Sequence, residues 1–254
     1  MNDQLTRENR NYWDRRAPTY TDVVRKNLGD GWDEVWADML ISRFPQSGAA
    51  PLRILDVGTG PGFYAIILAA RGFEVTAVDF SENMLAEAHR NAEALAERID
   101  FRRMDAHALD FPDGSFDVIV TRNLTWNLSD PLRAYRDWLR VLRPGGAALI
   151  FDANWYGYLV DEEKQRAWDR DRENVRRAAY EDHDAYPESR RMEDISRRLP
   201  MTRRSRPEWD VDVLKSMGCA RVTADTGISD RVWNPEEKLN YASTPGFLIH
   251  AVKQ

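Results

Sequence analysis

The sequence ILDVGTGPGF, at residues 54–63, decides the expected fold. An apolar run that ends in Asp56 and Val57 leads into a glycine-rich turn, and an apolar helical pattern begins at Phe63. Glycine permits positive φ and lets a ligand approach the backbone closely. A turn of this kind that follows a parallel strand lies at the sheet edge where α/β folds bind ligands. The stretch therefore predicts a strand, a ligand-binding loop and a helix.

The spacing of the glycines distinguishes between kinds of nucleotide loop. A dinucleotide fingerprint needs glycine where Phe63 stands, because its third glycine comes one position later than Gly62. A P-loop needs Gly-Lys-Ser/Thr, which does not follow here. Asp56, directly before the loop, suits a cationic ligand better than a pyrophosphate, since its carboxylate can meet an ammonium group directly or through water. Phosphate binding is not favoured, and a nicotinamide-dependent oxidoreductase stays as an alternative.

Alternating apolar runs and helical patterns extend outward from this loop. The expected strands are 52–57, 74–79, 99–104, 116–121 and 147–152, and the expected helices between them are 63–71, 81–96 and 130–142. The Pro-Gly-Gly sequence within 143–146 is interpreted as a turn. Strands that alternate with helices predict a parallel sheet with helices on both faces.

The same patterns divide the chain into four parts. Residues 1–50 form an expected N-terminal helical lid, with a break at Pro18 and a loop at 45–51, and residues 51–152 form the cofactor-binding core. Residues 153–206 are dense in charged and aromatic side chains and predict a helical cap inserted over an acceptor site. Residues 207–254 predict a helix and antiparallel strands that complete the core.

Composition excludes several classes of protein. The chain has 254 residues, a net charge of −6 and no basic stripe, so we expect no nucleic-acid partner. It has no apolar run long enough to span a bilayer and no signal peptide at its start, and Cys219 is its single cysteine. We therefore expect a cytoplasmic protein without membrane insertion. The oligomeric state cannot be read from the sequence.

Two further carboxylates follow the next expected strands. Asp79 ends the strand at 74–79, where a carboxylate can accept both hydroxyls of a ribose, although it could instead stabilise the start of the helix that Ser81 caps. Asp105 follows the strand at 99–104, where it could accept from the exocyclic amine of adenine. Together with the loop, these acids predict a site for a nucleoside.

Several motifs in order then resemble a known family. After the glycine loop come VDFS at 78–81, DA at 105–106, FDVI at 116–119 and VLRPGG at 141–146. With them the chain resembles class I S-adenosylmethionine-dependent methyltransferases, in the small-molecule branch similar to ubiquinone/menaquinone-type enzymes. The resemblance implies a Rossmann-like seven-stranded sheet whose last strand is antiparallel. It also implies S-adenosyl-L-methionine as cofactor, with S-adenosyl-L-homocysteine as product.

The resemblance also indicates which residues bind the cofactor. NYWDRRAPTY at residues 11–20 resembles the N-terminal lid that closes over the cofactor in many such enzymes. The expected cofactor-binding residues are Tyr12, Trp13, Tyr20, Asp56, Gly58, Thr59, Gly60, Gly62, Asp79, Phe80, Met84, Asp105, Ala106 and Arg122.

Methyl transfer requires in-line placement of the acceptor, and a general base only when the acceptor carries a proton into the reaction. Residues after the fourth and fifth strands should face the methyl group, and the expected substrate-binding residues are Asn123, Trp126, Trp155 and Tyr156. The candidate bases are His183, Asp152 and Tyr156, and no spacing predicts a metal site. Five tryptophans are expected over the same edge of the sheet: Trp13, Trp126, Trp155, Trp168 and Trp233. A non-catalytic cofactor-binding protein is the second alternative.

Overall fold

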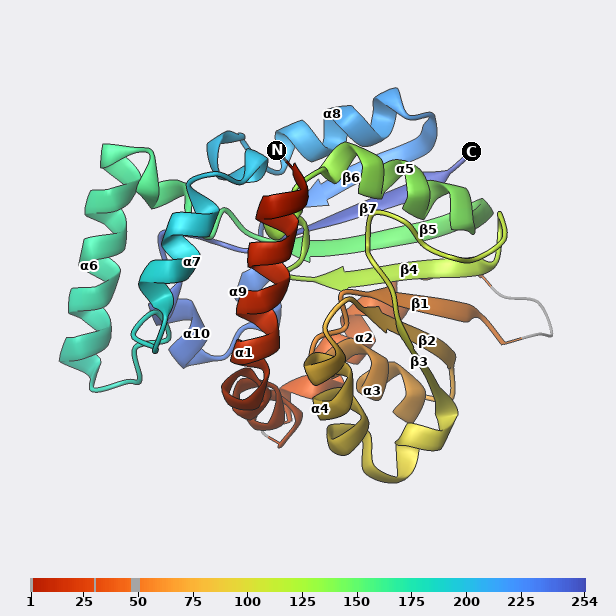
Figure 1. Cartoon of the computed structure of the whole chain (residues 1–254), viewed down its shortest axis with the longest axis horizontal. Helices are drawn as coiled ribbons and strands as arrows, with labels where there is room; N and C mark the ends of the chain where they lie inside the picture. Colours follow the sequence, from red (N-terminus) through yellow and green to blue (C-terminus); the bar gives the residue numbers. More distant parts are fainter. Residues whose placement is uncertain (1, 30, 47–50) are drawn as a thin grey trace.

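A computed structural model describes residues 2–29, 31–46 and 51–254, so positions 47–50 of the expected loop lie outside the described residues. Seven strands form one sheet in the order β3-β2-β1-β4-β5-β7-β6 (Figure 1). Their bounds are β1 Arg53–Val57, β2 Glu74–Asp79, β3 Ile99–Arg103, β4 Phe116–Arg122, β5 Leu142–Asp152, β6 Cys219–Asp225 and β7 Phe247–Lys253. β7 is antiparallel to both β5 and β6, which confirms the expected antiparallel last strand.

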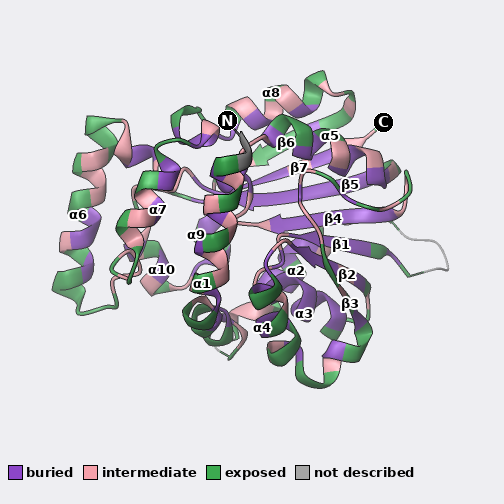
Figure 2. Ribbon diagram, in the orientation of Figure 1, coloured by how far each residue is buried: buried purple, intermediate pink, exposed green. Residues whose placement is uncertain are grey.

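Helices cover both faces of the sheet, which confirms the Rossmann-like class. One face carries α2 (Trp32–Ile41), α3 (Phe63–Ala70) and α4 (Glu82–Ala92), while the other carries α5 (Pro131–Val141) and α8 (Glu208–Ser216) (Figure 1). Each face has its own buried apolar core, and Figure 2 shows the central strands β1, β4 and β5 between them as mostly buried. The apolar run of β4, buried from Phe116 to Thr121, is typical of a central parallel strand.

The helix-start signals act as the sequence predicts. The Ser81 hydroxyl accepts from the Met84 backbone N–H at the start of α4. Asp130 does the same for Arg133 at the start of α5, whose first residue is Pro131. Side-chain oxygens at these positions satisfy backbone donors that have no partner within the helix. The turns at the carboxyl ends of β2 and β4 are thereby fixed in place.

Two local expectations are wrong. Pro18 does not end a helix, because α1 runs from Asn2 to Gly29 with the proline inside it. The expected turn at 143–146 is part of β5, since the register with β4 shifts between Phe116 and Val118 and the strand absorbs the extra residues as an irregularity. A proline removes one backbone hydrogen bond from a helix, and a β-bulge leaves one residue of a strand unpaired. The helix or strand can still continue past that point when the residues on either side are packed against the rest of the protein.

The remaining helices gather beyond the carboxyl ends of β4 and β5. Residues 153–206 form α6 (Glu162–Ala178), α7 (Ser189–Ser196) and short 3-10 turns, and the chain later adds α9 (Ser229–Val232) and α10 (Pro235–Asn240). Figure 1 shows α6, α7 and α10 at this end of the sheet, with α1 crossing beside them. α9 and α10 were not expected from the sequence. Within the described ranges, no helix is long and apolar enough to cross a bilayer.

Candidate functional site

The glycine loop leaves β1 in a conformation that side chains disfavour. Gly58 and Gly60 have φ of 69° and 52°, and a Cβ on Gly58 would lie 2.7 Å from the Leu124 side chain. The N–H of Gly58 donates to Val78 O at 2.8 Å, which ties the loop to the end of β2. Gly62 serves a different purpose, because a Cβ there would meet Ala88 at 3.1 Å. Gly62 therefore brings α3 close to α4 and does not line the adjoining cavity.

Two buried carboxylates lie on either side of this loop. Asp56 accepts from the Thr59 hydroxyl at 2.7 Å and from Ala65 N at 3.1 Å. Asp79 accepts from Gly60 N and from Ser81 N, both at 2.9 Å. Burial raises the pKa of Asp56 to about 7 and that of Asp79 to about 6, although the hydrogen bonds act in the opposite direction. Both groups are nearly inaccessible to water, with 2% and 7% exposure.

A cavity of about 70 Å³ lies against the loop, and we call it the loop cavity. Its lining includes ten of the 14 residues expected to bind the cofactor: Trp13, Tyr20, Asp56, Gly58, Thr59, Gly60, Asp79, Phe80, Met84 and Arg122.

 Gly58 and Gly60 have no side chain and can contribute only backbone to this wall. The loop cavity is therefore built mainly by residues that the sequence assigned to a cofactor.

A small cavity of about 30 Å³ adjoins the end of β3 and shares Phe80, Leu124 and Asn127 with the loop cavity. Asp105 and Ala106 line it, as expected for residues that would meet an adenine. The Asp105 carboxylate pairs with His107 Nδ1 at 2.6 Å, and this hydrogen bond lowers the pKa of Asp105 to about 2. The loop cavity and the small cavity lie side by side along the carboxyl ends of β1, β2 and β3. A nucleoside bound at Asp79 would extend in the same direction.

A large cavity of about 510 Å³ opens beyond β4 and β5. Asn123, Trp126, Trp155 and Tyr156, the four residues expected to bind substrate, all line it. All five tryptophans expected over this edge line it as well, which confirms that expectation. The large cavity meets the loop cavity at residues common to both: Trp13, Tyr20, Val24, Arg122 and Asn123.

Arg122 and Asn123 lie at the junction between these cavities. The Arg122 guanidinium lies over the rings of Trp36 and Phe63, at 4.6 and 4.5 Å from their centroids. Asn123 has φ of 55°, a left-handed conformation that non-glycine residues rarely adopt. Its carbonyl accepts from the indole N–H of Trp126 at 2.8 Å. The loop after β4 is thus fixed where the two cavities meet.

Besides Gly62, two of the expected residues lie away from the cavity in which they were placed. Tyr12 borders the large cavity and not the loop cavity, and its hydroxyl donates to the Tyr186 hydroxyl at 3.2 Å. Asp152 has no exposed surface and lines none of the three cavities described above. Its carboxylate accepts from Trp126 N at 2.8 Å and pairs with Arg206 at 3.1 Å. This environment suits a structural carboxylate and gives Asp152 no route to a substrate proton.

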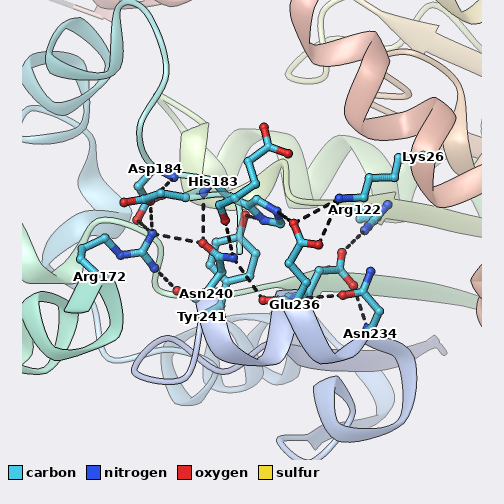
Figure 3. A network of polar contacts seen from close by, with 12 residues as sticks. Lys26, Arg122, Arg172, His183, Asp184, Asn234, Glu236, Asn240 and Tyr241 are labelled. Atoms are coloured by element: carbon cyan, nitrogen blue, oxygen red, sulfur yellow. Dashed lines mark hydrogen bonds and ion pairs between the residues drawn. The ribbon is translucent and has the colours of Figure 1, made fainter. Parts of the chain in front are cut away.

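His183 borders the large cavity from the cap. Figure 3 shows the polar contacts around it. Its Nδ1 lies 3.1 Å from the Tyr241 hydroxyl, and its Nε2 lies 2.9 Å from Glu236 Oε1. The backbone N–H of His183 donates to Asn240 Oδ1 at 3.0 Å, which holds the cap loop against α10. Tyr156, the third candidate base, shares a hydrogen bond with Tyr186 at 3.2 Å, and burial raises its pKa well above the ordinary range.

One group of potential metal ligands forms within the described part of the chain. Donor atoms of Glu181, His183 and Glu236 lie within 4.8 Å of one another, although the sequence spacing predicts no metal site. The Lys26 ammonium already lies 3.1 and 3.2 Å from the two oxygens of Glu236. The positive charge beside this carboxylate is therefore supplied by α1.

Sequence reasoning missed the contribution of α10. Glu236 and Tyr241 flank His183, yet neither was a candidate. The sequence does hold a helix-start signal here, because Asn234 precedes Pro235 and Glu237 occupies the third position. The structure shows the resulting capping box, with Asn234 Oδ1 accepting from Glu237 N at 2.8 Å. Nothing in that local pattern indicates that the helix lies against the cap.

Comparisons with known proteins agree with this geometry. Residues 55–150 match the methyltransferase domain family. The demethylmenaquinone methyltransferase of Thermus thermophilus is 38% identical over 138 residues, which are 54% of this chain and 61% of that protein. A ubiquinone/menaquinone biosynthesis C-methyltransferase of Roseobacter denitrificans is 32% identical over 152 residues, 58% of this chain and 57% of that protein. The chain thus spans less than two thirds of the length of these relatives.

Solved structures share the fold over most of this chain. A Methanococcus maripaludis protein, proposed to be an S-adenosyl-L-methionine-dependent methyltransferase, covers 95% of this chain at a TM-score of 0.63 and 24% identity, and 93% of that protein is matched. A Haemonchus contortus phosphoethanolamine N-methyltransferase, solved with S-adenosyl-L-methionine, covers 86% of this chain and 52% of its own at a TM-score of 0.60 and 20% identity. Residues 55–150 thus match the methyltransferase domain family, and most of the chain shares its fold with these solved structures.

Proposed function

We propose that this chain binds S-adenosyl-L-methionine and transfers its methyl group to a small molecule held in the large cavity. The observation that carries the proposal is the junction of the two cavities. The loop cavity is lined by the glycine loop, Asp56 and Asp79, and it meets the large aromatic cavity at Arg122 and Asn123. A sulfonium methyl group placed at that junction would point from the cofactor toward the acceptor.

The carboxylates suit the two ends of this cofactor. Asp79 lies where a ribose would present two hydroxyls, and it can exchange its backbone partner on Gly60 for them. Asp105 and Ala106 would meet the adenine edge in the small cavity. Asp56 lies beside the loop, where a cationic amino group would approach. S-adenosyl-L-homocysteine, the product, keeps the same adenosine and amino-acid ends.

The protein would accelerate transfer by placing the acceptor in line with the sulfonium. Trp126 and Tyr156 form one wall of the large cavity, with ring centroids 5.0 Å apart. Trp155 forms another wall and is held by its indole N–H, which donates to Asp152 Oδ1 at 3.0 Å. Residues 153–206 would act as the acceptor cap and α1 as the lid, as the domain boundaries in the sequence suggest. The aromatic lining favours a small acceptor with flat or apolar surface.

A pair of variants tests the two halves of this proposal separately. Asp79→Ala should weaken S-adenosyl-L-methionine binding by roughly 1–3 kcal/mol, because two ribose hydroxyls lose their acceptor. Trp155→Ala combined with Tyr156→Ala should leave that affinity within about threefold, or roughly 0.65 kcal/mol, and abolish methyl transfer. Calorimetry measures the first effect. Release of S-adenosyl-L-homocysteine across a panel of small acceptors measures the second.

Circular dichroism of each variant provides the folding control, and NAD provides the control ligand. Unchanged affinity in Asp79→Ala would refute the ribose assignment. Full transfer activity in the Trp155 and Tyr156 double variant would refute the acceptor cavity. Tight binding of S-adenosyl-L-methionine by wild-type protein, with no acceptor in any class, would favour a non-catalytic cofactor-binding protein.

A further inference from the structure

The imidazole of His183 has both ring nitrogens engaged. Nε2 lies 2.9 Å from Glu236 Oε1, and Nδ1 lies 3.1 Å from the Tyr241 hydroxyl (Figure 3). His183 therefore has no free nitrogen to take a proton directly from a molecule in the large cavity. A proton that reaches this imidazole must come through one of the two partners.

The charge on Glu236 decides which nitrogen carries the hydrogen. The Lys26 ammonium, which can only donate, lies 3.1 and 3.2 Å from the two oxygens of Glu236, so both oxygens accept. Glu236 is therefore a carboxylate and can only accept. A neutral imidazole has one N–H and one acceptor nitrogen. Nε2 donates to Glu236, so Nδ1 accepts from the Tyr241 hydroxyl.

The Tyr241 hydroxyl donates its only hydrogen to His183 and keeps its oxygen lone pairs. Tyr241 borders the large cavity and packs against Trp155, with ring centroids 5.0 Å apart. Trp155 belongs to the proposed acceptor wall, so the Tyr241 ring lies beside the proposed acceptor site. The Tyr241 hydroxyl is fixed by His183, which also lines the large cavity. A hydrogen-bond acceptor at this place is complementary to a molecule that carries an O–H or N–H group.

Neighbouring elements hold Tyr241, His183 and Glu236 in these positions. Asn240 accepts from the backbone N–H of His183 at 3.0 Å and donates to Glu181 O at 3.0 Å. Arg172 of α6 pairs with Asp182 and Asp184, on either side of His183 in the chain. The charged groups that face the imidazole and its partners are Lys26 on α1, Glu181, Asp182 and Asp184 in the cap loop, Arg172 on α6, and Glu236 and Glu237 on α10.

We propose that Tyr241, His183 and Glu236 form a proton relay that takes a proton from the acceptor, and that the acceptor is therefore a hydroxyl or amine compound. This inference rests on the proposed methyl transfer. As the acceptor oxygen or nitrogen bonds to the methyl carbon, the carbon–sulfur bond breaks and its electron pair stays on sulfur. The acceptor proton moves to Tyr241 Oη, and the Tyr241 proton moves to His183 Nδ1. The resulting imidazolium is held against the Glu236 carboxylate.

Tyr241 is a catalytic residue in this proposal because it contacts the acceptor. His183 receives the proton from Tyr241, and Glu236 positions the imidazole of His183 and stabilises its positive charge. The relay never requires a lasting tyrosinate, since the tyrosine gains one proton as it loses another. This matters because burial raises the pKa of Tyr241 well above its ordinary range. An acceptor without an O–H or N–H group would give the Tyr241 oxygen no hydrogen-bond donor, and the relay would have no partner.

The experiment uses 4-nitrophenol as a probe, because its phenolate absorbs visible light and its phenol does not. The full chain is saturated with S-adenosyl-L-homocysteine, and the absorbance of bound 4-nitrophenol is followed across pH. The relay should accept the phenol proton and lower the apparent pKa of the bound probe by about one unit, a tenfold shift. Tyr241→Phe and His183→Gln should abolish that shift. Tyr180→Phe, at an exposed tyrosine, makes the same chemical change away from the cavity and should keep it.

Each result decides the proposal. If the pKa of bound 4-nitrophenol is still lowered in Tyr241→Phe, the relay is wrong. Positive side chains such as Arg122 would then be what stabilises the phenolate. If the wild-type protein binds 4-nitrophenol with no shift, or does not bind it, the proposed acceptor class is wrong. Calorimetry with S-adenosyl-L-homocysteine is run on the same samples. If the wild-type protein does not bind S-adenosyl-L-homocysteine, the methyltransferase proposal itself is wrong. If it binds this ligand but the shift in 4-nitrophenol pKa is missing, only the relay proposal is wrong.

Discussion

Asp56 and Asp79 are buried carboxylates whose hydrogen bonds come mostly from backbone N–H groups of the loop and helix starts. Burial disfavours the charged form, and backbone donors recover only part of that cost. In the proposed function, hydroxyl donors and positive charge on the cofactor would recover more of that cost. The same arrangement costs stability in the ligand-free protein.

Asp79→Asn should reveal that cost as a dependence on pH. The pKa of Asp79 is raised from 3.8 to about 6 by burial, so the folded state binds more protons than the unfolded state between about pH 4 and pH 6. Folding stability due to this group is present below that window and is lost as pH rises through it. The free energy of unfolding of wild type, relative to the variant, should fall from pH 4 to pH 7.

Urea denaturation at several pH values measures the difference. Asp113→Asn, at an exposed carboxylate, provides the background. A difference between wild type and Asp79→Asn that stays constant across this range would mean that Asp79 keeps its ordinary titration in the folded protein.

Among the elements, α1 connects all parts of the proposed site. The Asp14 backbone carbonyl accepts from Asn83 at 2.9 Å beside α4, and Trp13 and Tyr20 line the loop cavity. At the other side of α1, Lys26 reaches Glu236 of α10. One helix thus covers the loop cavity and one edge of the large cavity, and a cofactor bound beneath it would add contacts to its middle part.

Residues 12–20 of α1 should therefore exchange backbone hydrogens more slowly when S-adenosyl-L-methionine is bound. The ligand should reduce local opening, because Trp13 and Tyr20 gain a partner in the loop cavity. Hydrogen exchange followed by mass spectrometry measures this. α5, on the far face of the sheet, is the internal control and should change little. Equal protection of residues 12–20 in both states would contradict the lid.

Across the whole molecule, Arg206 joins segments far apart in the sequence. Its guanidinium pairs with Asp152 at the end of β5 at 3.1 Å and with Asp210 on α8 at 2.8 Å, and it lies over the Phe247 ring of β7 at 5.0 Å. Asp152 in turn holds Trp126 and Trp155, the walls of the large cavity. The cap therefore rests on a buried ion pair that ties it to the sheet.

Arg206→Gln should destabilise the protein by roughly 3–5 kcal/mol, because Asp152 and Asp210 would stay buried without their positive partner. Chemical denaturation monitored by circular dichroism measures the loss. Arg203→Gln, at an exposed arginine of the same segment, is the matched control. A cost below about 1 kcal/mol, the usual range for a surface ion pair, would mean that water reaches these carboxylates and that they are not held as the structure places them.

The core of the fold is largely predictable from local sequence. Runs such as FDVIV before Thr121 have to be buried on both faces, and glycines at 58, 60 and 62 permit the turn that follows β1. The acids Asp79 and Asp105 follow strands, so parallel pairing alone brings them to one edge. These features depend on periodicity and backbone freedom, which are properties of neighbours in the chain.

The relay residues show where local sequence stops being informative. His183 was a candidate, but Glu236 and Tyr241 lie more than 50 positions later, and no periodic pattern links them to it. Asp152 was expected to act as a base at the end of its strand, and only the arrival of Arg206 on the folded cap gives it a structural partner. The sequence by itself determined the sheet, the loop and the acids of the proposed cofactor site, because strand and turn patterns are local. Tertiary structure alone decided which charged groups meet in the cap, because side chains distant in the chain become neighbours only when the helices pack.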